Sequence, residues 1–288
     1  MDFLLLFDKI ELPEEARKLF WDLEEVRKSN KDFDNDIKRV FDLHKDHIEE
    51  CEKLTVELSD KYEIPLCSYQ LYIQLLLCER AYNYYVAEKR DLEVFYDSMS
   101  DICVRIERNY RISKSEHVGI DNFLWLHGFI YLWRFKAGRL EYDYGVVTIP
   151  FDMEYGGKKY TKGQKALKIH IPSYLKFNHE LCMDSYRRAR KYLEEVYGEG
   201  DMPIVCTSWM VAPYLLNLLN EGSSIADFIN DFYIYEEIDA PEAPLEWVFG
   251  GKKENIDDYP ENTSLQRNLK AYIKNGGKVG KATGLLKY

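Results

Sequence analysis

Apolar residues recur at helical spacing throughout the first 115 positions of the chain. Between residues 12 and 30, apolar side chains three or four positions apart line one face of a predicted helix. A proline near the start of that segment and the acidic residues directly after it are typical of a helix N-terminus. Similar stripes run through residues 66–89 and 91–110. We therefore predict an all-helical domain over residues 1–115.

The pattern changes after a polar segment that ends in a glycine, residues 111–119, and we expect a second domain over residues 116–288. Alternating or β-branched segments predict strands, and capped periodic segments predict helices. The predicted strands are residues 138–149, 167–171, 202–210, 232–238 and 245–250. The predicted helices are residues 120–135, 178–198, 212–222, 224–232 and 262–277. This succession predicts an α+β domain built on a mostly antiparallel sheet.

Local signals fix some of these ends. Asn178 is a good N-cap for the helix that follows it, and Gly198 is a typical residue to end that helix. Residues 154–166 carry three glycines and are expected to form a turn, and residues 278–288 are expected to form a short tail.

Composition and charge narrow the classes of partner. With 46% hydrophobic and 31% charged residues the chain is typical of a soluble globular protein. Its formal net charge of -11 argues against nucleic-acid binding and against an anionic membrane surface, because both need basic patches. The apolar N-terminal run is too short to span a bilayer and has no basic segment before it, so we expect a cytoplasmic protein.

Metal and phosphate motifs are weak or missing. The six cysteines form no CxxC pair and are expected to be buried thiols. His44 and His47 are three positions apart on a predicted helix, but no further ligands complete a zinc motif. No GxxxxGK[ST] phosphate loop is present. We expect neither a metal site nor a nucleotide loop of that kind.

The strands at residues 167–171 and 202–210 hold the candidate chemistry. Alternation sends Lys168 and His170 to the face opposite Ile169. If the two strands are neighbours, the imidazole of His170 and the thiol of Cys206 or the hydroxyl of Ser208 could face one cleft. A histidine at such a place is also common as a simple hydrogen-bonded strand residue.

Four stretches resemble a family of bacterial proteins described as acyltransferase domain-containing. They begin with WLHGFIYLWRF, LKIHIPSYLKFN, CTSWMVAPYL and NTSLQRNLKAY, and they occur in matching order over nearly the whole chain. Members of that family join a helical N-acyltransferase N-terminal domain to a C-terminal domain like the GNAT fold. The resemblance therefore implies an α+β protein with an all-helical N-terminal domain followed by a GNAT-like mixed sheet.

In GNAT-like folds two central parallel strands diverge and acyl-CoA enters between them. The resemblance implies that acyl-CoA or acetyl-CoA is the co-substrate and that a small-molecule or peptide amine is the acceptor. The residues expected to bind the pantetheine and the pyrophosphate are Lys168, Ile169, Ile171, Ser173, Tyr174, Lys176 and Asn178. The pyrophosphate segment PSYLKFN contains no glycine, whereas such loops are usually glycine-rich.

For acyl transfer we expect His170 to be the base that takes a proton from the amine, since its ordinary pKa lies near neutrality. Cys206 or Ser208 is expected to donate a proton to the leaving sulfur or to orient the acyl carbonyl.

Two other functions remain open. The glycine-free segment favours a non-catalytic binding or interaction module on a degenerate GNAT-like scaffold. A thiol hydrolase that uses Cys206 and His170 is the third.

Overall fold

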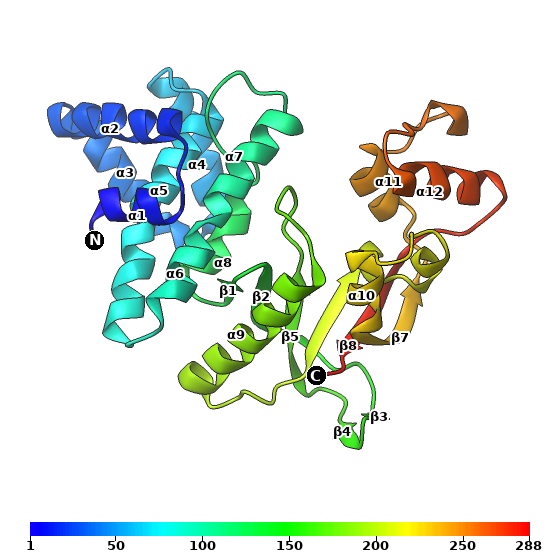
Figure 1. Ribbon diagram of the computed structural model, residues 1–288. Helices are drawn as coiled ribbons and strands as arrows, with labels where there is room; N and C mark the ends of the chain where they lie inside the picture. The colour runs from blue at the N-terminus through cyan, green and yellow to red at the C-terminus, as the bar shows by residue number, and fades with distance from the viewer. The chain divides into compact units, whose positions relative to one another are not determined.

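The computed structural model describes residues 1–288, which form two compact units (Figure 1). Unit 1 comprises Met1–Glu141 and Pro172–Leu175, and unit 2 comprises Tyr142–Ile171 and Lys176–Tyr288. The sequence-based joint between residues 115 and 116 falls within unit 1, and the domain division at that point stays a prediction. No helix is long and apolar enough to cross a bilayer.

Unit 1 is helical over most of its length, as the apolar stripes predict (Figure 1). Its elements are α1 (Phe3–Lys9), α2 (Glu14–Ser29), α3 (Lys31–His44), α4 (Ile48–Lys61), α5 (Leu66–Ala87), α6 (Leu92–Met99), α7 (Asp101–Arg111), η1 (Phe123–Leu126), α8 (His127–Ile130) and β1 (Arg134–Ala137). The side chain of Asp2 caps α1, and that of Asn30 caps α3. Residues 68–78 of α5 are all buried, so this part of the helix lies at the centre of the unit.

The predicted apolar helix at residues 120–135 is wrong in its extent. Only the short elements η1 and α8 form there, and the chain then turns into β1. Leu132 takes a left-handed backbone angle, with φ of 64°, which ends the helical path. Gly128 lies so near that turn that an added Cβ would come within 2.9 Å of the Trp133 ring. The chain therefore folds back on itself where hydrophobicity alone predicts a continuous helix.

A pair of buried carboxyl groups lies inside unit 1. Asp101, at the first position of α7, is fully buried and accepts a hydrogen bond from the Arg105 guanidinium at 3.0 Å. Glu141 is also buried, and its carboxyl group hydrogen-bonds to that of Asp101. Burial, reinforced by the neighbouring Asp101 carboxylate, raises the pKa of Glu141 well above its ordinary value. Glu141 is therefore protonated in the folded protein at pH values where it ionises in the unfolded chain.

Unit 2 contains most of the larger sheet and the helices that cover it (Figure 1). Its elements are β2 (Leu140–Thr148, which begins in unit 1), β3 (Met153–Tyr155), β4 (Lys158–Tyr160), β5 (Lys165–His170), α9 (His179–Tyr197), β6 (Ile204–Ser208), η2 (Trp209–Val211), η3 (Pro213–Asn217), α10 (Ser224–Asn230), β7 (Phe232–Ile238), α11 (Glu242–Phe249), η4 (Ile256–Asp258), α12 (Ser264–Lys274) and β8 (Lys281–Leu286). Asn178 caps α9 and Gly198 ends it with φ of 67°, which confirms both predicted ends.

The strand order of the larger sheet is β1-β2-β5-β6-β8-β7. Strands β5 and β6 pair in parallel, whereas β8 pairs antiparallel with both β6 and β7. The sheet is therefore mixed, with its parallel pair at β5 and β6. A separate hairpin of β3 and β4 forms where a turn was expected. The predicted α+β class is confirmed.

Two sequence-based assignments near the C-terminus are wrong. The predicted strand at residues 245–250 is instead the end of α11, which runs from Glu242 to Phe249 and is followed by the left-handed Gly250, with φ of 75°. The predicted tail contains β8, whose residues from Ala282 to Leu286 are all buried. A strand that is buried on both faces lacks the alternation that identifies a strand in a sequence.

The two faces of the sheet in unit 2 have different covers. On one face, the Tyr142 hydroxyl lies 2.8 Å from the Ser185 hydroxyl of α9. On the other, Ala166, Val205 and Leu285 pack into a small cluster with Ile149. Residues from the β3–β4 hairpin, such as Met153, complete that cluster.

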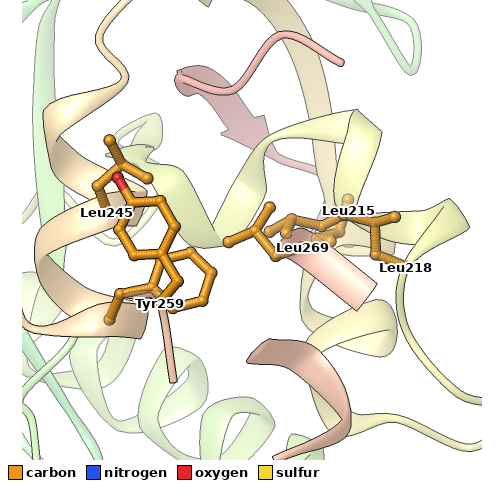
Figure 2. Close-up of a cluster of buried hydrophobic side chains, with 7 residues drawn as sticks. Leu215, Leu218, Leu245, Tyr259 and Leu269 are labelled. Atoms are coloured by element: carbon orange, nitrogen blue, oxygen red, sulfur yellow. The ribbon is translucent and has the colours of Figure 1, made fainter. Parts of the chain in front are cut away.

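A second hydrophobic cluster joins the helical segments that lead into and out of β7 (Figure 2). Its buried members are Leu215, Leu218, Ile229, Leu245, Phe249, Tyr259 and Leu269. Figure 2 shows Leu269 of α12 beside Leu215 and Leu218, with Tyr259 next to Leu245. This cluster fixes the helices that connect β7 to β8.

Glu141→Gln tests the buried carboxyl pair. A carboxyl whose pKa is higher in the folded than in the unfolded state makes stability fall as pH rises from about 4.5 toward the raised value. We expect wild-type melting temperatures to fall across that window more steeply than those of the variant, as measured by calorimetry at a series of pH values. Equal slopes for the two proteins would contradict the buried-proton account.

Leu269→Ala tests the cluster of Figure 2. Leu269 is fully buried, and its truncation is expected to lower the free energy of unfolding by about 2–5 kcal/mol. Leu216→Ala is the matched control, because Leu216 is 41% exposed and belongs to the adjoining η3. It is expected to change that free energy by no more than about 0.5 kcal/mol. Urea unfolding that ranks the two variants equally would refute this cluster as a core.

Candidate functional site

The parallel ladder between β5 and β6 stops before either strand ends. Its pairs are Leu167 with Ile204, Lys168 with Val205 and Ile169 with Cys206. Strand β5 continues to His170, and β6 continues to Ser208 while it stays paired with β8. The edge of β6 that faces β5 therefore has no β5 partner from Thr207 onward. We call this unpaired end of the ladder the opening.

The register decides which side chains share a face of the sheet. Residues paired in a ladder point to the same face, and neighbours along a strand point to opposite faces. Ile169 and Cys206 thus share one face. His170 and Thr207, each one position further on, share the other face and flank the opening from its two sides.

His170 is paired with a buried carboxylate. Its Nε2 lies 2.8 Å from Oδ2 of Asp143 on β2, and the Asp143 side chain is only 4% exposed. Tyr142 faces α9, so the alternation of β2 directs Asp143 to the opposite face, where His170 lies. A carboxylate at Nε2 favours the tautomer that carries its proton on that nitrogen.

The opening does not bring Cys206 or Ser208 together with His170. Cys206 is fully buried on the opposite face, and burial raises the pKa of its thiol to about 12. The Ser208 hydroxyl accepts a hydrogen bond from the backbone N–H of Met210 at 3.1 Å, as the N-cap of η2. The expectation that either side chain shares a cleft with the imidazole therefore does not match this register.

A hydroxyl does face the opening, and it belongs to Thr207. Its Oγ1 lies 3.1 Å from Oγ1 of Thr283 on β8, the residue with which it is paired in the ladder. The Thr283 hydroxyl in turn donates to Oε2 of Glu236 on β7 at 3.2 Å. A polar row thus runs across the sheet from β6 to β7, on the face that carries His170.

The segment after β5 has an unusual backbone. Tyr174 takes a left-handed conformation with φ of 62°, although it is a bulky residue. The backbone N–H groups of residues 173–175 donate no hydrogen bond within the structure. Successive free N–H groups around a left-handed residue form the type of concave site that binds anions.

Arginines of unit 1 hold this segment. Arg139 Nη2 donates to the backbone carbonyl of Pro172 at 2.9 Å and to that of Leu175 at 3.4 Å. Arg108 Nη1 donates to the Ser173 hydroxyl at 3.4 Å, and the Arg111 guanidinium lies 5.0 Å from the centre of the Tyr174 ring. The segment also borders a cavity of about 300 Å³ lined in part by the buried Lys136.

The other predicted binding residues lie as follows. Lys168 is partly exposed on the His170 face, and Ile169 is buried on the face of Cys206. Ile171 directly follows β5, and Lys176 is exposed. The Asn178 side chain accepts a hydrogen bond from the Leu181 backbone N–H at 2.8 Å, so it caps α9.

The histidine pair near residue 45 offers no metal site. His44 is fully buried, and burial lowers the pKa of its imidazole to about 3. His47 is exposed and lies 3.8 Å from Glu50. No group of three or more histidine, cysteine or acidic side chains in the structure converges in a way that could hold a metal ion.

Sequence reasoning missed Asp143, Thr207, Thr283 and Glu236. One signal was available for Asp143, which lies between two tyrosines of a predicted strand. An acidic residue in a strand that packs against the core needs a polar partner on its own face. No local signal identifies the other three, because the ladder register alone brings them into one row.

Residues 134–286, more than half of the chain, match the family of GNAT-like C-terminal domains. The chain belongs to that family. The GNAT-like C-terminal part that the resemblance implied is thus confirmed, together with a helical N-terminal part. A search of curated proteins finds no match.

Several solved acyltransferase structures are similar to this GNAT-like chain. One, in complex with decanoyl-CoA and teicoplanin, has a TM-score of 0.70 and 17% identity over 98% of this chain and 86% of its own. Another, in complex with decanoyl-CoA, has a TM-score of 0.64 and 17% identity, and the match covers 100% of this chain and 99% of the other. A third, in complex with CoA and 10C-teicoplanin, has a TM-score of 0.63 and 19% identity, and the match covers 78% of this chain and 68% of the other. At these identities the likeness establishes the fold.

Thiol reactivity tests where Cys206 lies. Because the thiol is buried and its pKa is raised to about 12, we expect no alkylation of Cys206 by iodoacetamide in the native protein at pH 8. The partly exposed Cys67 is the internal reference and is expected to react. Peptide mass spectrometry measures both sites, and fast labelling of Cys206 would favour a thiol hydrolase instead.

Proposed function

We propose that this protein transfers an acyl group from acyl-CoA to an amine, with His170 as the general base. The observation that carries the proposal is the His170–Asp143 pair at the end of the interrupted β5–β6 ladder. Such an opening offers unpaired backbone to an extended ligand, and the pair puts a proton acceptor beside it. The GNAT-like family of residues 134–286 supports the same reading.

The chemistry needs a neutral amine beside the thioester carbon. In the proposal, the imidazole of His170 takes the proton that the amine loses as it attacks, while Asp143 stabilises the imidazolium through Nε2. The amine nitrogen bonds to the acyl carbon, the C–S bond breaks, and CoA leaves as a thiolate that takes up the released proton. No covalent enzyme intermediate is needed, which agrees with the buried thiol of Cys206.

Thr207, rather than Cys206 or Ser208, is the β6 residue that we assign to the site. Its hydroxyl lies on the His170 face, at the first β6 position beyond the ladder. Because the Thr283 hydroxyl gives its proton to Glu236, the Thr207 hydroxyl gives its own proton to Thr283, and we assign the Thr207 oxygen to accept a hydrogen bond from an N–H of the acceptor amine. Its contact with the Thr283 hydroxyl keeps the side chain in one orientation.

Residues 173–178 remain our proposed phosphate-binding segment, with backbone N–H groups supplied without glycine. The left-handed Tyr174 takes the conformation for which such loops normally use glycine. Arg108 and Arg111 add positive charge beside Ser173 and Tyr174. Lys168, Ile169 and Ile171 are the strand residues we assign to the pantetheine.

Medium-chain acyl-CoAs are the first donors to test, because similar solved acyltransferases are described in complex with decanoyl-CoA and with octanoyl-CoA. Another similar acyltransferase structure is described in complex with decanoyl-CoA and teicoplanin, which supports an amine acceptor of small-molecule or peptide type. The opposing hypothesis is a non-catalytic binding module, and the glycine-free segment at residues 172–178 is the feature that favours it.

His170→Ala is expected to lower kcat for amide formation by about 10²- to 10⁴-fold, because the general base is lost. CoA release from decanoyl-CoA in the presence of an amine panel measures the rate. The KM for decanoyl-CoA is expected to stay within about twofold, since the imidazole acts on the amine.

Asp143→Asn serves as the second arm, and it should give a smaller fall in kcat with the same unchanged KM. Melting temperatures of all variants check the fold. Full turnover by His170→Ala would refute the assigned base. Absence of both CoA release and stabilisation by decanoyl-CoA in the wild type would support the binding module.

A further inference from the structure

Strand β7 contains a bulge that changes where its acidic residues point. Its pairing with β8 runs through Ile234 with Gly284 and then resumes at Glu236 with Thr283, so Tyr235 is an extra residue. Tyr235 packs against the cluster that contains Val205 and Leu285. In a regular strand two successive side chains point to opposite faces, but a bulge allows both to share one face.

Glu236 therefore lies on the same face as His170 and Thr207. The Thr283 hydroxyl, which donates to Oε2 of Glu236, is itself 3.1 Å from the Thr207 hydroxyl at the opening. Two consecutive hydrogen bonds thus separate the Glu236 carboxylate from the side of the opening formed by β6. Without the bulge, Tyr235 would stand opposite Thr283 instead.

The charge of Glu236 is not neutralised within the protein. Glu236 is exposed, and no lysine, arginine or histidine forms an ion pair with it. The nearest cation along β8 is Lys281, two positions before Thr283, and it makes no such pair either. One carboxylate oxygen is oriented by Thr283, which leaves the group able to accept hydrogen bonds from a ligand.

We propose, on the basis of the acyl transfer described above, that Glu236 binds a second ammonium group of the acceptor. The attacking nitrogen has to be neutral, and a carboxylate beside it would hold its proton. A carboxylate two hydrogen bonds away suits a different nitrogen of the same molecule. The acceptor class is therefore a diamine or polyamine, in which one amine reacts beside His170 and another is held by Glu236.

The formal net charge of -11 is consistent with a cationic substrate, since an acidic protein attracts cations over long distances. A monoamine of equal length lacks the group that Glu236 binds. The structure thus assigns to Glu236 a role in choosing the acceptor rather than in the chemical step.

The test compares 1,5-diaminopentane with n-pentylamine as acceptors, with octanoyl-CoA as the donor. In the wild type we expect a KM for the diamine at least about fivefold lower than that for the monoamine, a ratio typical of one hydrogen-bonded charge pair. Glu236→Gln should remove this preference by raising the KM for the diamine alone.

Glu237→Gln is the matched control. Glu237 is the next residue on β7 and pairs with Ala282, so it points to the opposite face. This variant should keep the preference for the diamine, and the melting temperatures of both variants check that the sheet is intact. Equal KM values for the two amines in the wild type, or a preference that survives Glu236→Gln, would overturn the inference.

A binding arm separates this inference from the proposed function. Ligand-observed NMR measures the binding of 1,5-diaminopentane to wild type and Glu236→Gln without any CoA ester. Binding that depends on Glu236, together with no CoA release, leaves the recognition site standing and refutes the acyl transfer. CoA release that Glu236→Gln does not affect supports the acyl transfer and refutes the recognition site. Absence of both binding and release refutes both.

Discussion

The early end of the β5–β6 ladder is the constraint on which the candidate site depends. Because pairing stops at Ile169 and Cys206, the next residues, His170 and Thr207, flank an opening rather than a continued sheet. The same register decides that the imidazole and the threonine hydroxyl share one face. It also leaves Cys206 on the other face, in the interior. A shift of one residue would exchange these two sets of side chains.

Polar residues on neighbouring strands orient the side chains beside that opening. Asp143 orients the imidazole from β2, and Thr283 orients Thr207 from β8. The β7 bulge adds Glu236 at the far end of the same row. His170, Thr207 and Glu236 are each held by a hydrogen bond to a neighbouring side chain, so the face presents an imidazole, a hydroxyl and a carboxylate in a defined order. That order suits an amine acceptor laid across the strands.

The segment that follows β5 reaches its shape by different means from a glycine-rich loop. The backbone of Tyr174 is left-handed, which costs energy for a residue with a side chain. Arg139 holds carbonyls on both sides of it, and Arg111 lies over its ring. These contacts favour the left-handed conformation. The lack of glycine in PSYLKFN is therefore no obstacle to a left-handed turn at Tyr174.

The sequence predicts the features that depend on residues close together in the chain. The ends of α9 follow from Asn178 and Gly198, and the alternation of β5 correctly separates His170 from Ile169. The row from Thr207 to Glu236 joins residues far apart in the chain, and only the ladder registers of β6, β7 and β8 bring them together. Strand β8 itself escapes prediction because burial on both faces removes its alternation.

Hydrogen–deuterium exchange with and without decanoyl-CoA tests the central claim most directly. If the opening between β5 and β6 receives the co-substrate, backbone amides of residues 167–171, 173–178 and 204–209 should exchange more slowly when the ligand is present. His170→Ala should show the same protection, because it removes only the base. Protection confined to other segments, or none at saturating ligand, would contradict the account.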